Sequence, residues 1–195
     1  MNADEIKRLL QWSRQCDINL IIDESFLDFA DAENLSLLSE QVLKENKNLY
    51  VVKSISKSYG VPGIRLGILA SGNTDMIGRL KKDVSIWNIN SMAEFFMQIL
   101  DKYKSDYTDS LRKIKEERSR FLNELCAIKN LKVYPSQANY FMCEILDGIS
   151  SEELAGRLLK ENILIKDLTG KIHNGKQYIR IAIREKRRTG YWWRN

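Results

Sequence analysis

The chain has 195 residues, of which 44% are hydrophobic and 29% charged, enough for one large domain or two small lobes with a real core. The net charge is +5, but the basic residues do not form the aromatic-interleaved stripe of a nucleic-acid-binding surface. No apolar run approaches the length of a membrane span. Met1–Glu5 is not typical of a secretory signal peptide. Three cysteines without metal-ligand spacing, Cys16, Cys126 and Cys143, indicate reduced thiols and a cytoplasmic protein.

Residues 1–90 alternate between helical and extended patterns. Periodic apolar positions predict helices over residues 4–16, 35–45 and 75–82. Continuous apolar runs at Asn19–Ile22 and Leu49–Val52 predict strands buried on both faces, and a further run follows at Leu66–Ala70. This order is the pattern of a parallel α/β sheet with helical crossovers. Functional groups collect at the carboxyl ends of such strands, where Asp23 and Lys57 both lie.

A long helical stretch follows, from a capping-box pattern at Ser91 and Glu94 to about residue 127. Because this stretch is too long for one lobe, we expect it to bend near Ser105–Asp106 or to span two lobes. The remaining pattern predicts a small α+β lobe, with strands over residues 131–134, 139–145, 163–165 and 178–183 and a helix from Ser150 to about Lys160. The predicted organisation is a large domain over residues 1–90, a connecting helix over 91–127 and a small domain over 128–195.

The most informative stretch is Ser54–Gly67, in which a lysine follows a strand among hydroxyl side chains, three glycines and a proline. A lysine amine held beside other cations or in an apolar pocket becomes a nucleophile toward aldehydes. A surface lysine in a polar turn is the simpler alternative. Ser54-x-x-Lys57 also matches the Ser-x-x-Lys of serine acyl-enzymes. That class is disfavoured because Pro62 and glycines follow where its helix would begin, and the sequence has no Ser-Asp-Asn element.

The spacing Ser-x-Ser-Lys, followed by Gly-x-x-Gly-x-Arg-x-Gly, resembles the pyridoxal-phosphate lysine signature of the class I and II aminotransferases. In detail it is most similar to the branch that holds histidinol-phosphate aminotransferase and threonine-phosphate decarboxylase. The resemblance implies an α/β chain of fold type I, with an incomplete large domain of parallel sheet and helices and a small α+β C-terminal lobe. It covers nearly the whole chain but only the later half of a full family member, so we expect a fragment, a split gene or a truncated chain.

The resemblance also implies roles for the cofactor, pyridoxal 5′-phosphate (PLP). Lys57 would form the Schiff base with its aldehyde and move protons, and Asp23 would hold its ring nitrogen. Ser54, Ser56 and Arg65 would hold its phosphate. Phe26 stands where family members usually carry a tyrosine that donates to the cofactor's phenolic oxygen. Because phenylalanine has no hydroxyl, the electronic tuning of the cofactor would be altered.

Substrate-binding roles are implied for three further residues. Arg180 lies in a segment that resembles the late strand whose arginine binds the substrate α-carboxylate, and a solvated surface charge is the alternative. Asn139 and Asn88 lie in segments that resemble those near the substrate. His173 is the only histidine and lies in a polar loop, so it is a weak candidate for a catalytic base.

The implied function is amino-group transfer, through Lys57, between an amino acid or phosphorylated amine and a 2-oxo acid. Decarboxylation of a phospho-amino acid is the neighbouring chemistry. An inactive remnant, or one part of a split or bifunctional enzyme, is the other alternative, because the N-terminal part of the family's site cannot be placed in this sequence. The expected partners are small-molecule substrates and either a second copy in a homodimer or the missing N-terminal half. No metal, nucleic acid or membrane partner is expected.

The tail Thr189–Asn195 stands where the resembled family continues into an amphipathic helix. Tryptophan has a single codon, so reading Tyr191-Trp192-Trp193 one register over gives Leu-Val, which such a helix would contain. We therefore hypothesise a frameshift between about Arg184 and Thr189. An ordinary polar-aromatic tail is the alternative, and DNA sequencing distinguishes the two.

Overall fold

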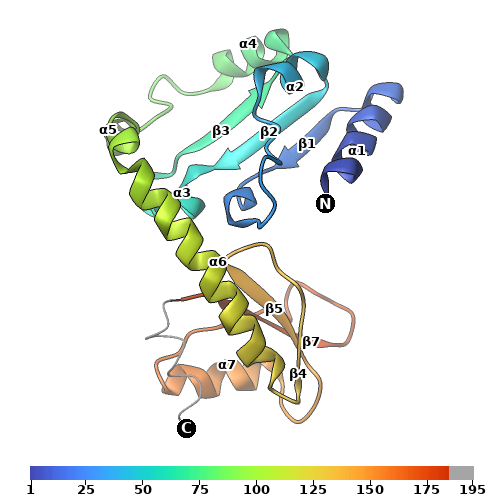
Figure 1. Ribbon diagram of the computed structural model, residues 1–195, viewed down its shortest axis with the longest axis vertical. Coiled ribbons are helices and arrows are strands. Elements are labelled where there is room, and N and C mark those ends of the chain that lie inside the picture. Colours follow the sequence, from blue (N-terminus) through green and yellow to red (C-terminus); the bar gives the residue numbers. More distant parts are fainter. Residues whose placement is uncertain (185–195) are drawn as a thin grey trace. The chain divides into compact units, whose positions relative to one another are not determined.

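The structure is a computed structural model that describes residues 1–184 (Figure 1). The chain divides into two units, Met1–Thr108 and Asp109–Asn195, and the division falls within the long helix α6 (Lys104–Cys126). The tail Thr189–Asn195, on which the frameshift hypothesis rests, lies outside the described residues. In residues 1–184 no helix combines the length and the apolar character that crossing a membrane requires.

Unit 1 is built on a three-stranded sheet in the order β1-β2-β3. Its strands are β1 (Leu20–Asp23), β2 (Leu49–Ser54) and β3 (Gly67–Ser71). Its helices are α1 (Ala3–Gln15), α2 (Glu40–Glu45), α3 (Ile55–Ser58), α4 (Thr74–Asp83) and α5 (Ser91–Ile99). Its 3₁₀ turns are η1 (Leu27–Phe29), η2 (Pro62–Ile64) and η3 (Leu100–Tyr103).

The predicted parallel pairing is confirmed for β1 and β2, where Asp23 lies opposite Val52. Strand β3 runs antiparallel to β2, with Gly67 opposite Ser54. The reason is the connection: only the short turns α3 and η2 lie between these strands, and neither is long enough to cross the face of the sheet. The carboxyl ends of β1 and β2 therefore share one edge, while β3 begins there.

The core of unit 1 lies between the sheet and two helices. Leu49 and Val51 are fully buried and Leu37 nearly so. Half-buried side chains from α1, α2 and β1 pack against them: Ile6, Leu10, Val42, Leu43, Leu20 and Ile22. The prediction that β1 is buried on both faces is wrong, because Ile21 is 68% exposed. Residues alternate between faces along a strand, and the helices α1 and α2 cover only the face that carries Leu20 and Ile22.

Two predicted helix starts are wrong. The helix expected from residue 35 begins at Glu40, because the buried Glu24 accepts hydrogen bonds from Leu37 N (2.6 Å) and Ser36 Oγ (2.8 Å) and holds this segment outside the helix. The helix expected from the capping-box pattern at Ser91, α5, is capped by Asn90, whose side chain accepts from Ala93 N, instead of by Ser91. The long helical stretch changes to 3₁₀ geometry at η3, before residues 105–106, and its last part, α6, spans both units, as the second alternative predicted.

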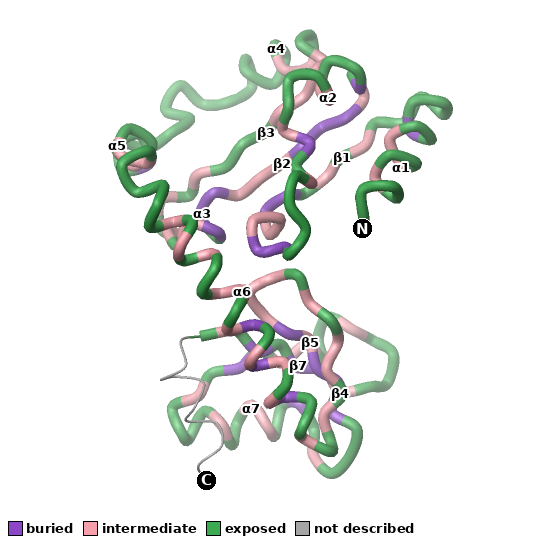
Figure 2. Tube along the Cα trace, viewed as in Figure 1, coloured by how far each residue is buried: buried purple, intermediate pink, exposed green. Residues whose placement is uncertain are grey.

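Unit 2 pairs the second part of α6 with a four-stranded antiparallel sheet in the order β4-β5-β7-β6. Its elements are β4 (Leu131–Val133), β5 (Tyr140–Ile145), α7 (Ser151–Lys160), β6 (Lys166–Asp167) and β7 (Gln177–Ala182). Phe121 and Leu125 of α6 pack on Phe141, Cys143 and Ile179, all nearly inaccessible to solvent. Figure 2 shows this burial along β5 and β7.

The predicted cap of α7 is confirmed, since the side chain of Ser150 accepts from Glu153 N. The strand expected over residues 163–165 is wrong. Ile163 N donates to Leu158 O (2.9 Å), and Asn162 has a left-handed backbone with a φ of 60°, so this segment forms the turn that ends α7. The strand β6 begins afterwards, at Lys166.

Candidate functional site

Asp23 and Lys57 lie at the shared edge of β1 and β2. Asp23 is the last residue of β1, and Lys57 lies in α3, which follows β2 directly (Figure 1). Both side chains are exposed, and the positive charge of Lys57 acts on the Asp23 carboxylate. Because the two strands are parallel and adjacent, the fold places a carboxylate and an amine from separate segments together.

Asp23 is held as an anion by Ser25. Hydrogen bonds from the side chain and the backbone N–H of Ser25 hold the pKa of Asp23 below its usual value; burial works in the opposite direction, and the charge of Lys57 lowers the pKa further. The backbone bond, from Ser25 N to Asp23 Oδ1, is 2.8 Å long. Ser25 Oγ also accepts from Ser54 N at 3.0 Å, so this buried serine joins the end of β1 to the end of β2. Sequence analysis did not single out Ser25.

Lys57 lies against an aromatic ring. Its Nζ is 4.4 Å from the centre of the Phe26 ring, close enough for a cation–π interaction, which at an exposed site contributes about 0.5–1 kcal/mol. Phe26, which lacks the hydroxyl that members of the resembled family usually carry at this position, therefore supplies an apolar face to the lysine. A tyrosine at this position would keep the ring and add a donor.

Ser54, Ser56 and Arg65 line one hollow of about 450 Å³, a volume typical of small-molecule sites. Arg65 has a left-handed backbone with a φ of 53°, which is uncommon outside glycine. Gly67 lies opposite Ser54, and a Cβ on it would come within 3.2 Å of Lys53 O. The absence of a side chain at this glycine therefore lets β3 approach β2 beside the hollow.

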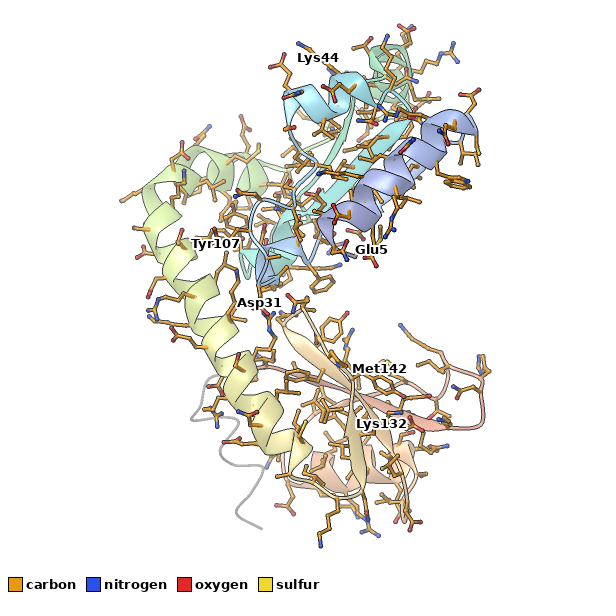
Figure 3. The ribbon with its side chains drawn as sticks, turned by 45° about the vertical axis from the view of Figure 1, so that its right-hand side comes forward. Glu5, Asp31, Lys44, Tyr107, Lys132 and Met142 are labelled. Atoms are coloured by element: carbon orange, nitrogen blue, oxygen red, sulfur yellow. The ribbon has the colours of Figure 1, made fainter. Side chains whose placement is uncertain are left out.

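A polar network next to this hollow was not predicted. Asp28, in η1, accepts from Lys53 Nζ (2.6 Å) and from the Tyr107 hydroxyl (2.8 Å), and Figure 3 labels Tyr107 near the start of α6. Burial opposes ionisation of Asp28, but hydrogen bonds from donors that include Lys53 and Tyr107, together with the charge of Lys53, outweigh it and leave the pKa of this carboxyl below its usual value. These three residues are far apart in sequence, and no local pattern marks them.

The remaining predicted residues lie elsewhere in the two units. Asn88 is in the exposed segment before α5, and the neighbouring Asn90 donates to Ile64 O (2.8 Å), which ties that segment to the loop after Lys57. His173 lies exposed in the loop between β6 and β7 of unit 2. Among residues 1–184 no cluster of three or more histidine, cysteine, aspartate or glutamate side chains could bind a metal ion.

Arg180 and Asn139 both belong to unit 2. Arg180 is exposed on β7, with its guanidinium carbon 5.0 Å from the Tyr140 ring. It pairs in register with Met142, which Figure 3 labels on the same sheet. This sheet face is opposite the buried one, because neighbouring residues of a strand point to alternate sides. Asn139 precedes β5, and its carbonyl accepts from Ile183 N.

Comparison with known proteins gives consistent matches. The model of a family described as aminotransferase class I and II matches residues 1–187. The chain is 37% identical, over 87% of its length, to a CMP-5′-(3-aminopropyl)phosphonate synthase of Streptomyces rubellomurinus, and 36% identical, over 85%, to an L-serine phosphate decarboxylase of Campylobacter jejuni. It spans 27% and 44% of these two relatives.

Among solved structures, a histidinol-phosphate aminotransferase from Clostridium acetobutylicum superposes with a TM-score of 0.88 at 29% identity. The match covers 98% of this chain and 57% of that one. The two units therefore have the fold of the corresponding part of that enzyme.

Proposed function

This chain belongs to the class I and II aminotransferase family, and we propose that its first unit binds the family's cofactor, PLP, and uses Lys57 to move protons at the α-carbon of an amino-acid substrate. The fold class and the cofactor of the family agree with the sequence resemblance. The chain spans about half or less of the relatives described above, so the reaction is a proposal for this chain.

One observation carries the proposal: a carboxylate, an amine and a hollow lined by Ser54, Ser56 and Arg65 lie near the carboxyl ends of the neighbouring strands β1 and β2. PLP has a ring nitrogen, an aldehyde and a phosphate, which need an anion, a lysine and hydrogen-bond donors respectively. Asp23 is ionised, Lys57 lies within its electrostatic range, and the hollow is lined by hydroxyls and a guanidinium. A Cβ on Gly67 would press on the wall of this hollow. The residues present therefore fit the group.

Each residue has a distinct task in this proposal. Asp23 keeps a proton on the ring nitrogen, because its anionic form is stabilised by Ser25. Ser54, Ser56 and Arg65 bind the phosphate, for which a guanidinium offers paired donors. When bound, PLP supplies an electron sink for the pair left on the substrate α-carbon. Lys57 Nζ accepts and returns protons beside the Phe26 ring, whose apolar surface excludes water from one side of the amine.

Two reactions of this class are candidates. Amino-group transfer is the reaction that the sequence resemblance implies first, and in it Lys57 removes the proton of the substrate α-carbon. In decarboxylation no such proton is removed, and Lys57 would return a proton to the α-carbon after CO₂ leaves. The identity to the Campylobacter L-serine phosphate decarboxylase (36%) exceeds that to the Clostridium histidinol-phosphate aminotransferase (29%), which favours a phosphorylated amino acid as substrate and decarboxylation as reaction.

Substrate binding is proposed for Arg180, Asn139 and Asn88. Arg180 is supported by its exposure on the sheet face of unit 2 opposite the buried core, where its guanidinium can receive a carboxylate in a paired geometry while the Tyr140 ring holds its plane. Its proposed ligand is the substrate α-carboxylate. Asn139 and Asn88 are proposed as further substrate-binding residues on the resemblance alone, through their side-chain amides.

A second copy of the chain is the proposed partner. Large apolar side chains of unit 1 are exposed in and around α5: Ile86 (94%), Trp87 (88%), Met92 (66%) and Phe95 (57%). Exposed apolar groups at this density are typical of a protein interface. We expect a homodimer in which this segment is covered.

The test is a product assay on the purified chain with PLP. O-phospho-L-serine and O-phospho-L-threonine are supplied alone for CO₂ release, and histidinol phosphate is supplied with 2-oxoglutarate for glutamate formation. CO₂ release that Lys57→Ala abolishes and Lys44→Ala keeps supports decarboxylation, since Lys44 is an exposed lysine of α2 paired with Glu40. Glutamate formation with the same dependence supports amino-group transfer. No product above the Lys57→Ala background contradicts both reactions and supports the inactive alternative.

A further inference from the structure

The network of Asp28, Lys53 and Tyr107 is partly buried and contacts none of the predicted PLP ligands through its hydrogen bonds. The side chains of Lys53 and Asp28 are only 14% and 18% exposed, and their atoms Nζ and Oδ1 lie 2.6 Å apart. The second carboxylate oxygen of Asp28 accepts from the Tyr107 hydroxyl at 2.8 Å. Burial raises the pKa of the Tyr107 phenol, so this group stays a protonated donor.

The network also reaches the far side of the Lys57 helix. The Tyr107 ring is stacked on Tyr59, with centroids 3.9 Å apart and planes 6° apart, and Phe96 packs on Tyr59 edge-on at 6.0 Å. Tyr59 is the C-cap of α3. Lys53 lies in β2, which leads directly into α3, and Tyr59 follows the last residue of α3. One contiguous set of contacts therefore holds both ends of the helix that carries Lys57.

The helix α3 needs such anchors. It has four residues, far fewer than an isolated helix requires to persist in water. Lys57 itself is exposed, and a cation–π contact at an exposed site, such as the one with the Phe26 ring, contributes little to fixing the amine. Asp28 lies in η1, which follows Asp23 after a short turn, and its ion pair with Lys53 ties η1 to the end of β2.

We propose that Asp28, through Lys53 and Tyr107, is a positioning residue that fixes the Lys57 helix relative to Asp23. The inference rests on the proposed function, because the spacing matters if one cofactor must reach both side chains. An ion pair kept for stability alone would be replaceable, since a buried pair contributes little more than well-packed apolar groups of the same size. The network of Asp28, Lys53 and Tyr107 has a geometric task because its members contact the segments before and after Lys57 and the segment after Asp23.

The test compares two variants with a matched control. Asp28→Asn removes the charge and keeps the shape, and Tyr107→Phe removes one hydroxyl and keeps the ring stacked on Tyr59. Tyr107→Phe is the milder change and decides the question if Asp28→Asn does not fold. The control is Asp109→Asn, which removes a carboxylate paired with Arg112 and Lys113 on the exposed surface of α6.

The first readout is amide hydrogen exchange without cofactor. The amides of Tyr59, Gly60 and Val61 donate to carbonyls of α3, so their exchange reports on the Lys57 helix. We expect both variants to exchange there about tenfold faster, the factor that corresponds to losing one hydrogen bond, while the core amide of Val51 changes less than about twofold in Tyr107→Phe. The control should match the wild type at all of these positions.

The second readout is the PLP concentration that gives half-maximal labelling of Lys57 after borohydride. It should rise about tenfold in both variants and stay unchanged in Asp109→Asn. Unchanged exchange at Tyr59–Val61, or an equal acceleration at Val51, overturns the inference, because the network would then stabilise the unit as a whole or not at all. If the wild type takes up no PLP, the proposed function fails, and the exchange experiment still decides whether the network positions Lys57.

Discussion

Replacing Ser25 by alanine should lower the free energy of unfolding, and part of this loss of stability should depend on pH. Ser25 Oγ is the acceptor for Ser54 N at 3.0 Å, and Ser25 is only 5% exposed, so the variant leaves a partly buried N–H without this partner. A buried donor left unsatisfied costs about 1–3 kcal/mol. We expect Ser25→Ala to lower the free energy of unfolding at pH 7 by an amount in this range.

The pH-dependent part comes from Asp23. Hydrogen bonds from Ser25 hold the folded-state pKa of Asp23 below its ordinary value of 3.8. A lowered carboxyl pKa stabilises the folded state above the unfolded-state pKa, and this contribution is lost as the pH falls through the folded-state pKa. Ser25→Ala removes the largest cause of the shift. The pH-dependent part of the difference between wild type and variant should therefore be greatest at neutral pH, begin to shrink near about pH 4, where the unfolded state binds the proton, and vanish below the folded-state pKa, where both states bind it.

Urea unfolding at a series of pH values measures both parts. Ser71→Ala is the matched control, because Ser71 Oγ also accepts from a backbone N–H, that of Asn73, but donates to the Leu49 carbonyl instead of to an ionised side chain. Its destabilisation should not change between pH 7 and pH 3. An effect of Ser25→Ala that is equally independent of pH, or that grows as the pH falls, refutes the account of the Asp23 carboxylate.

Three further predictions follow from particular positions. A Cβ at Gly72 would lie 1.9 Å from Leu43 O, so Gly72→Ala should destabilise unit 1 by about 1–3 kcal/mol in urea unfolding, whereas Gly78→Ala in α4, with nothing within 4 Å, should stabilise it by up to about 1 kcal/mol. Burial raises the pKa of Cys143 to about 12, so iodoacetamide at pH 8 should alkylate the other two cysteines, which are exposed, and reach Cys143 only after unfolding. Trp87→Ser should shift sedimentation from dimer to monomer, and a wild type that sediments as a monomer contradicts the proposed interface.

Local patterns predicted the elements whose determinants are local. The run Leu49–Val52 is apolar at every position, and it forms the central strand of unit 1 with Leu49 and Val51 inaccessible to solvent. The Ser150 cap and the helix after it also follow from neighbouring residues. Where a distant partner competes, the pattern fails: the Glu24 carboxylate accepts a hydrogen bond from the backbone N–H of Leu37, so the helix predicted from residue 35 cannot begin there.

The candidate site was predictable only as far as its motif extends. The motif located Ser54, Lys57 and Arg65 and the family resemblance pointed to Asp23; all four lie in unit 1, with Asp23 and Lys57 at or just after the carboxyl ends of β1 and β2 and with Ser54 and Arg65 lining the hollow. The direction of β3 and the contacts of Asp28 depend on how separate segments pack. The partners of Asp28, Lys53 and Tyr107, are 25 and 79 residues away in sequence, beyond the reach of any periodicity.

The central claim is that Lys57 is the lysine that captures PLP. The most direct measurement is borohydride reduction of the purified chain with PLP, followed by peptide mapping, on wild type, Lys57→Ala and the exposed-lysine control Lys44→Ala. The account predicts one stable pyridoxyl group on the peptide that contains Lys57, present in the wild type and the control and absent from Lys57→Ala. Labelling that is the same in Lys57→Ala as in the wild type, or spread over surface lysines, contradicts it.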